Sequence, residues 1–305
     1  MKKDLISVTD LNAAEINELF ALTDALKNDS SRYSSVLKGK TLALIFQKPS
    51  CRTRVSFEVG MYQLGGNSLY LGPDELLLGV RESIKDVAMT LSRYLNGIVL
   101  RTFAHKNVVE MAMHATIPVI NGLSDFSHPC QALADIYSIR EKLGDLNNVT
   151  LAYVGDGNNV CHSLLYACSI IGLNMNVASP KGYTPDKSVL RQSQELAKTK
   201  NIKIKICVSP EEAVKGAGII YTDVWASMGQ EKETQKRKKI FKEFQVNAKL
   251  VNLAKKNALI MHCLPAHRQE EITDEVLDSK SSIVFDQAEN RMHVQKAILI
   301  KLLGV

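Results

Sequence analysis

Long hydrophobic runs and paired cysteine motifs are missing from this chain. No apolar stretch approaches the roughly 18 residues that a membrane-spanning helix needs. The six cysteines include no Cys-x-x-Cys pair, and Met1–Leu5 lacks the apolar core of a secretion signal. These absences argue against a membrane protein and against a disulfide-stapled secreted protein, so we expect a cytoplasmic location.

Positive charge is in slight excess but is not concentrated. The chain has 38 lysine and arginine residues against 32 aspartate and glutamate residues, a net charge of +6. One basic run, Lys236–Lys239, has flanks that are typical of the solvated face of a helix. Because a broad basic stripe with interleaved aromatic residues is absent, we expect no nucleic acid as a partner.

Two α/β domains fit the length and the pattern of the 305 residues. Apolar strand-like runs alternate with helical segments in both halves, which predicts two doubly wound parallel-sheet domains. A long helix over 129–143 ends at Gly144, so 145–148 is the expected domain boundary. The predicted strands cover residues 41–46, 68–71, 97–101, 117–121, 149–154, 174–178, 203–208, 218–222, 258–262 and 282–286.

A polar segment, Ser50–Arg54, follows the first predicted strand and opens a helix. Ser50 is a good helix N-cap, and free N–H groups at a helix N-terminus attract anions. With the guanidinium groups of Arg52 and Arg54 nearby, the segment predicts a site for a phosphate-sized anion. An arginine-rich first turn that is merely solvated stays the alternative.

Further polar residues follow other predicted strands. Arg101 ends the strand at 97–101, and His128 and Gln131 lie one turn apart at the start of the long helix. An imidazole and an amide at this spacing can hydrogen-bond one small carbonyl group from the same side. A helix cap with His128 as a bystander explains the same residues.

The turn Gly155–Asn159 invites comparison with a dinucleotide-binding fingerprint, but it fails the test. Val160 occupies the third glycine position, and no acidic residue ends the next predicted strand. Asparagines at such a turn can instead hold a carboxylate. A plain tight turn stays the alternative.

Asp223 and Cys263 end two predicted strands that we expect to be neighbours. A carboxylate beside a thiol can bind an amine and take its proton, whereas a zinc site needs four tetrahedral ligands, so we expect no metal. A nucleophilic Cys263 would need a histidine base. The adjacent His262 is expected on the opposite face of the strand.

Five motifs in this order together resemble the ornithine carbamoyltransferases of the aspartate/ornithine carbamoyltransferase superfamily: Phe46–Glu58, Leu100–Thr102, His128–Gln131, Asp223–Gly229 and His262–Pro265. The resemblance implies transfer of the carbamoyl group of carbamoyl phosphate to the δ-amine of L-ornithine, which gives L-citrulline and phosphate. It implies no cofactor. It also implies a homotrimer, or a multiple of trimers, with active sites at subunit interfaces.

The resemblance further implies a domain for each substrate. Residues 1–145 would bind carbamoyl phosphate, with a C-terminal helix at 288–305 returning to them, and residues 146–287 would bind ornithine. The implied carbamoyl-phosphate-binding residues are Ser50, Cys51, Arg52, Thr53, Arg101, His128, Gln131, Leu264 and Arg291. The implied ornithine-binding residues are Asn159, Asp223, Ser227 and Met228. The implied catalytic residues are Arg101, His128, Asp223 and Cys263.

Two positions depart from the family pattern. Cys51 stands where the family has threonine, and Leu77 stands where the family has a glutamine that reaches carbamoyl phosphate from a neighbouring subunit. Cys51 keeps its backbone N–H, so its effect is expected to be mild. Leucine cannot hydrogen-bond, so Leu77 predicts weaker carbamoyl-phosphate binding without loss of activity.

Three alternative functions stay open. The first is a carbamoyltransferase for another amine, such as putrescine or an acylated ornithine, because loops around 227–240 would choose the second substrate. The second is a nucleotide-dependent oxidoreductase that uses the second domain. The third is a catalytically silent relative that acts as a binding subunit, which the departure at Leu77 keeps open.

Overall fold

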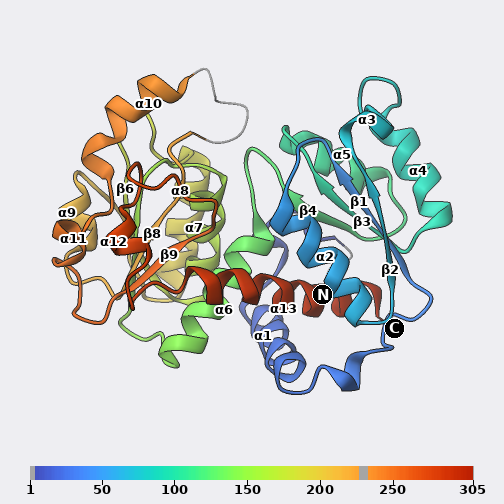
Figure 1. Cartoon of the computed structure of the whole chain (residues 1–305), viewed down its shortest axis with the longest axis horizontal. Coiled ribbons are helices and arrows are strands. Elements are labelled where there is room, and N and C mark those ends of the chain that lie inside the picture. The colour runs from blue at the N-terminus through green and yellow to red at the C-terminus, as the bar shows by residue number, and fades with distance from the viewer. Residues whose placement is uncertain (1–3, 227–232, 305) are drawn as a thin grey trace. The chain divides into compact units, whose positions relative to one another are not determined.

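Two parallel sheets organise the protein, as the computed structural model shows for residues 4–226 and 233–304 (Figure 1). One has four strands in the order β2-β1-β3-β4, and the other has five in the order β7-β6-β5-β8-β9. In each sheet the chain starts at an inner strand and winds to both sides. This confirms the predicted pair of doubly wound sheets.

The chain divides into two compact units, which comprise residues 1–137 with 289–305 and residues 138–288. We call them unit 1 and unit 2. Two helices pass from one unit to the other, α6 (Pro129–Leu143) and α13 (Val284–Leu303). The limits of the substrate domains, at residues 145 and 288, stay a prediction.

Unit 1 holds the four-stranded sheet. Its strands are β1 (Thr41–Phe46), β2 (Asn67–Leu71), β3 (Gly97–Arg101) and β4 (Val119–Leu123). Its helices are α1 (Ala13–Asn28), α2 (Cys51–Gln63), α3 (Pro73–Leu76), α4 (Ile84–Tyr94) and α5 (His105–His114), with short 3-10 turns at Val8–Asp10 and Ser31–Tyr33.

Unit 2 holds the five-stranded sheet. Its strands are β5 (Thr150–Val154), β6 (Asn174–Ala178), β7 (Ile204–Cys207), β8 (Ile219–Thr222) and β9 (Leu259–His262). Its helices are α7 (Asn159–Ile171), α8 (Lys187–Thr199), α9 (Pro210–Val214), α10 (Thr234–Phe241), α11 (Ala248–Val251) and α12 (Asp274–Leu277), with a 3-10 turn at Lys242–Phe244.

The inner strands are apolar on both faces because helices cover both sides of a parallel sheet. All five residues of β3 are buried, as are the last five of β1. The parallel register pairs Phe46 of β1 with Arg101 of β3, and Thr222 of β8 with His262 of β9. The chemical groups that follow these strands are therefore brought to common sheet edges.

The predicted strand over 282–286 is wrong. Ser282 forms only an isolated bridge with Ile260, and α13 begins two residues later. The buried positions continue at Val284, Gln287 and Arg291, which is helical spacing, while Phe285 is 74% exposed. Polar side chains at two of these buried positions hid the helical stripe, so the short apolar run was taken for a strand.

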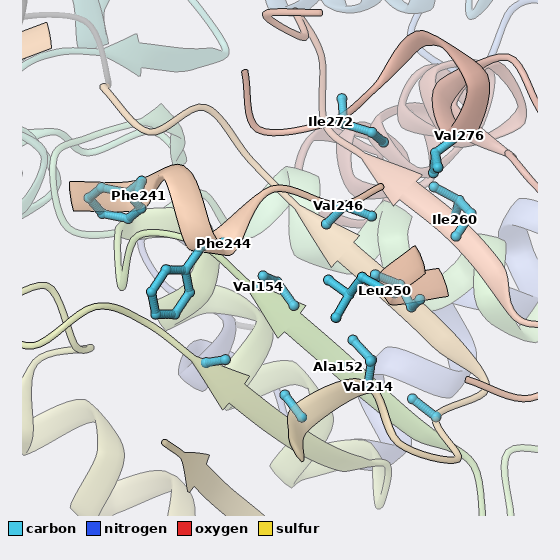
Figure 2. Packing of buried hydrophobic residues seen from close by; sticks show 14 of the residues in the cluster. Ala152, Val154, Val214, Phe241, Phe244, Val246, Leu250, Ile260, Ile272 and Val276 are labelled. Carbon is cyan, nitrogen blue, oxygen red and sulfur yellow. The ribbon is translucent and has the colours of Figure 1, made fainter. Parts of the chain in front are cut away.

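The core of unit 2 packs helices and turns against the central strands. Figure 2 shows Ala152 and Val154 on β5 near Val214 and Leu250. Further along the cluster, Phe241 at the end of α10 contacts three aromatic rings, those of Tyr183, Trp225 and Phe244. These contacts fix α10 beside the sheet.

No helix within residues 4–226 and 233–304 is both long enough and apolar enough to span a bilayer.

Replacing Phe241 by alanine should lower the free energy of unfolding by about 3–5 kcal/mol, because a fully buried ring leaves a cavity. Urea unfolding followed by fluorescence measures the change. Phe285→Ala is the matched control, since that ring is exposed, and should stay within about 0.5 kcal/mol of the parent protein. Equal losses in both variants would contradict the packing described.

Candidate active site

The start of α2 in unit 1 has the features of an anion-binding site. Ser50 has extended backbone angles and caps the helix, and its Oγ accepts the N–H of Thr53 at 3.2 Å. This confirms the predicted N-cap. The N–H groups of Cys51 and Arg52 belong to the first turn, where no helical carbonyl can accept them, so they are available to an oxygen-rich ligand.

Two buried arginines converge on the same turn. Arg101 at the end of β3 and Arg291 on α13 both donate to Thr53 Oγ1, from Nη1 at 3.5 Å and Nη2 at 3.2 Å. All three side chains are almost fully buried. Two guanidinium groups held side by side repel each other, so an anion between them would be stabilised strongly.

His128 lies buried among these cations, immediately before α6. Burial, together with the positive charges of Arg291, Arg101, Lys48 and Arg52, holds the pKa of His128 well below its usual range. The imidazole is therefore neutral near pH 7 and can donate only one ring hydrogen bond. Lys48 is a buried cation that the sequence analysis did not select, although it lies only two residues before Ser50.

Gln131 completes the cluster from the first turn of α6. Its Nε2 donates to Asp135 Oδ1 at 2.7 Å. Its Oε1 is buried and has no hydrogen-bond partner among the described residues. An acceptor in this state fits the NH₂ group of a small ligand.

The prediction that Arg54 joins the anion site is wrong. Its Nε donates to Glu58 Oε1 at 3.0 Å, one turn along the same helix. Its guanidinium also lies over the ring of Tyr70, 3.8 Å from the ring centre. Residues 52 and 54 point away from each other on a helix, so adjacency in sequence misled the prediction.

Leu77 lies in the loop that follows α3. Its φ of 46° is in the left-handed region, and 43% of the side chain is exposed. The loop is tied to the end of β1, because Gln47 Nε2 donates to the carbonyl of Leu78 at 2.9 Å.

In unit 2, two asparagines stand where β5 turns into α7. Asn158 is the N-cap, and its Oδ1 accepts the N–H groups of Val160 at 3.0 Å and Cys161 at 3.1 Å. Asn159, the predicted ligand, is buried at the first helical position and also accepts the N–H of Val160. The sequence analysis did not select Asn158, whose Nδ2 donates to Asp223 Oδ2 at 2.7 Å.

Asp223 and Cys263 are neighbours, as predicted. They follow β8 and β9, which pair in parallel, and Cys263 Sγ donates to Asp223 Oδ1 at 3.0 Å. The carboxylate is buried and the thiol is half-buried. A buried carboxylate that accepts hydrogen bonds suits a ligand amine.

His262 does not point away from Cys263 as predicted. Ligand atoms of Asp223, His262 and Cys263 lie within 4.8 Å of one another. The imidazole is nevertheless occupied, because Nδ1 accepts the N–H of Leu264 at 2.9 Å and Nε2 lies 3.0 Å from Glu271 Oε1. It therefore braces the turn after β9, where Leu264 adopts a φ of 56°.

The same three residues make a poor metal site. Three ligand atoms are too few for a structural zinc site, which uses four, and match only the number that a catalytic zinc site uses. Binding through His262 would also require it to give up its bond to the Leu264 N–H or to Glu271.

Gly157 shows a further difference between this turn and a dinucleotide-binding turn. A Cβ at this position would lie 2.2 Å from the nitrogen of Pro185, so the chain at 184–185 already fills the space. The Gly157 N–H donates to the carbonyl of Tyr183 at 2.8 Å. The glycine is therefore explained by close packing against the chain at 184–185, whereas the corresponding glycine of a dinucleotide fingerprint lets the backbone approach a pyrophosphate.

The basic run Lys236–Lys239 is not simply a solvated face, because Arg237 is buried. Its Nη1 donates to Asp156 Oδ2 and to the carbonyl of Trp225, both at 2.8 Å, and its Nε donates to Glu233 Oε2 at 3.0 Å. The guanidinium also lies over the ring of Tyr183. One side chain thus joins Asp156 to residues on both sides of 227–232.

The predicted ligands Ser227 and Met228 lie outside the described residues.

The family model described as aspartate/ornithine carbamoyltransferase, carbamoyl-P binding domain, matches residues 3–141. The family model described as aspartate/ornithine carbamoyltransferase, Asp/Orn binding domain, matches residues 147–302.

The chain belongs to the aspartate/ornithine carbamoyltransferase family. It is 52% identical over 304 residues to an ornithine carbamoyltransferase of Thermococcus kodakarensis, covering 99% of this chain and 96% of the relative. One from Listeria monocytogenes is 50% identical over 302 residues, with the same coverage. The solved ornithine carbamoyltransferase of Pyrococcus furiosus superposes with a TM-score of 0.95 at 51% identity, covering 98% of this chain and 96% of that one.

Titration of Asp156 in this carbamoyltransferase should change the free energy of unfolding. Burial raises the pKa of Asp156 from 3.8 to about 6, although Arg237 opposes the rise. Between pH 6 and pH 4, Asp156 is protonated in the native state but still largely ionised in the unfolded chain. Lowering the pH through this range therefore stabilises the native state. Relative to Asp156→Asn, the parent protein should gain about 2 kcal/mol in free energy of unfolding from pH 7 to pH 4.

Urea unfolding of both proteins across this pH range gives the difference directly. The Asp156→Asn substitution also changes stability by an amount that does not depend on pH, so only the slope with pH reports the titration, which already includes the ion pair with Arg237. A difference that does not change with pH would contradict the raised pKa.

Proposed function

We propose that this carbamoyltransferase transfers the carbamoyl group of carbamoyl phosphate to the δ-amine of L-ornithine and releases L-citrulline and phosphate. The observation that carries the proposal is the convergence of Arg101 and Arg291 on Thr53, at the capped start of α2. The names of its relatives, at about half identical residues, support ornithine as the second substrate.

The phosphate group is proposed to bind at the start of α2. Ser50, Cys51, Arg52 and Thr53 supply backbone N–H groups, hydroxyls and one guanidinium there. As the bond to the carbamoyl carbon breaks, negative charge grows on the leaving phosphate, and fixed donors stabilise that charge without reorganising. Cys51 contributes through its N–H, so the thiol is not required for this role.

The carbamoyl group is proposed to bind to His128, Gln131, Arg101 and Arg291, with the carbonyl of Leu264 as a further acceptor. Neutral His128 and cationic Arg101 would donate to the carbonyl oxygen, where charge develops during attack. The Oε1 of Gln131 would accept from the carbamoyl NH₂, which supplies its missing hydrogen bond.

The amine is proposed to bind in unit 2. An amine with a solution pKa near 10 must lose a proton before it attacks, so a proton acceptor at the site is needed. Asp223, beside Cys263, meets this need. Asn159, Ser227 and Met228 are proposed to bind the rest of ornithine. Holding both substrates in line supplies further acceleration, and the scheme uses no cofactor or metal.

Residues 1–145 with the C-terminal helix 288–305 are proposed as the carbamoyl-phosphate domain, and residues 146–287 as the ornithine domain. We further propose a cytoplasmic homotrimer, or a multiple of trimers. Support comes from large apolar side chains that unit 1 leaves exposed, among them Tyr62, Val80, Tyr94 and Met113.

A citrulline assay with carbamoyl phosphate and a panel of amines tests the reaction. Ornithine should be turned over, and putrescine and acylated ornithine should react far more slowly. Arg101→Gln should lower kcat/KM for carbamoyl phosphate at least about a hundredfold, because a donor to the developing charge is lost.

Arg191→Gln, at an exposed arginine of α8, should leave kcat/KM unchanged. If another amine of the panel reacts faster than ornithine, that amine replaces ornithine as the proposed substrate. If the parent protein is inactive but still binds carbamoyl phosphate, the alternative of a catalytically silent binding subunit is favoured.

Leu77 offers a test of the departure from the family pattern. Leu77→Gln should lower the KM for carbamoyl phosphate by about two- to tenfold, because one hydrogen bond is regained. Leu77→Met has nearly the same length without the amide and should show no gain. Initial-rate kinetics measure both, and an unchanged KM in the glutamine variant would refute the assigned effect of Leu77.

A further inference from the structure

We infer that Asn158 is a positioning residue, whose amide NH₂ aims the Asp223 carboxylate at the amine of the second substrate. The inference rests on the proposed function, and it adds a residue that the family resemblance did not select. Asn158 does not need to touch the substrate for this role, because it acts through Asp223.

The orientation of the Asn158 amide is dictated by its surroundings. Oδ1 accepts two backbone N–H groups, from Val160 and Cys161, and the hydroxyl of Tyr153, which shares its one proton with the Asp156 carbonyl, lies 3.2 Å from it. Only the oxygen of the amide can accept these bonds, so Nδ2 must face the other way. It donates to Asp223 Oδ2 at 2.7 Å.

Tyr153 strengthens this arrangement. The ring is fully buried on β5 and stacks on Tyr221 of β8. Its hydroxyl lies 2.9 Å from the carbonyl of Asp156 and near Asn158 Oδ1. The asparagine is thus held by a helix start and by a packed ring, so its NH₂ group has little freedom to turn.

The hydrogen bonds to Asp223 show where an amine would dock. Oδ1 accepts the N–H of Val224 at 2.8 Å and the S–H of Cys263 at 3.0 Å. Oδ2 accepts only Asn158 among the described residues. A carboxylate oxygen can accept about two hydrogen bonds, so Oδ2 keeps one position for an ammonium or amine N–H. The amide fixes the direction of that position.

The Asn158→Asp variant separates the two roles of the side chain, which are to cap α7 and to donate a hydrogen bond to Asp223. Aspartate caps a helix as well as asparagine does, so α7 should keep its start. The NH₂ group, however, becomes a carboxylate oxygen against Asp223, and like charges at this distance repel. The KM for ornithine should rise at least about tenfold, while the KM for carbamoyl phosphate stays within twofold.

Asn158→Ser is the second variant. A serine oxygen still caps the helix but gives no donor to Asp223, so the ornithine KM should rise about three- to tenfold. Asn247→Asp is the matched control, because Asn247 caps α11 through the N–H of Leu250, remote from Asp223 in sequence. It should leave both KM values unchanged. Thermal unfolding of each variant reports on the fold.

An ornithine KM within twofold of the parent value in Asn158→Asp would overturn the inference. So would an equal rise in both KM values, since that indicates a general structural role. If Asn158→Asp does not fold, Asn158→Ser decides by the same criteria. A folded parent protein that forms no citrulline would overturn the proposed function itself, and this inference with it.

Discussion

Repulsion among buried positive charges is the constraint on which the anion site of unit 1 depends. Arg101 and Arg291 share the hydroxyl of Thr53, and Lys48 lies close enough to help keep His128 neutral. Such an arrangement costs free energy, which interactions with polar or negative groups offset. It persists because β3, α2 and α13 hold the side chains from three directions. A bound anion would relieve the remaining repulsion, and this relief would add to its affinity.

Unit 2 balances its charges in the opposite way. Asp223 and Asp156 are buried acids, and a single arginine compensates the second of them. Asp223 is held by neutral donors, the amide of Asn158 and the thiol of Cys263, so its charge is left for a cationic partner. One unit would thus favour an anion and the other a cation, which matches the acyl phosphate and the diamine of the proposed reaction.

Local sequence patterns correctly predicted the structural features that are determined by residues close together in the sequence. Strand ends, the Ser50 cap and the pairing of Asp223 with Cys263 follow from periodicity and from parallel topology. Predictions failed where tertiary contacts decide. Arg54 donates to Glu58 instead of joining the anion site, and Arg237 leaves the solvated face of its basic run because it pairs with Asp156. The segment that begins at Val284 is helical, and its buried face continues through polar residues, Gln287 and Arg291. A single sequence does not show which polar residues are buried, so this helical face was missed.

The route of the chain has a consequence for how the protein is made. Arg291 belongs to unit 1 but follows all of unit 2 in sequence, and α13 also places Val294 and Ile298 in the buried interior of unit 1. When residues 1–137 have left the ribosome, the four-stranded sheet therefore still lacks α13, and the start of α2 lacks one of the two arginines that converge on Thr53. Unit 1 can therefore complete its buried core, and the pair of arginines at Thr53, only after the whole of unit 2 has been synthesised.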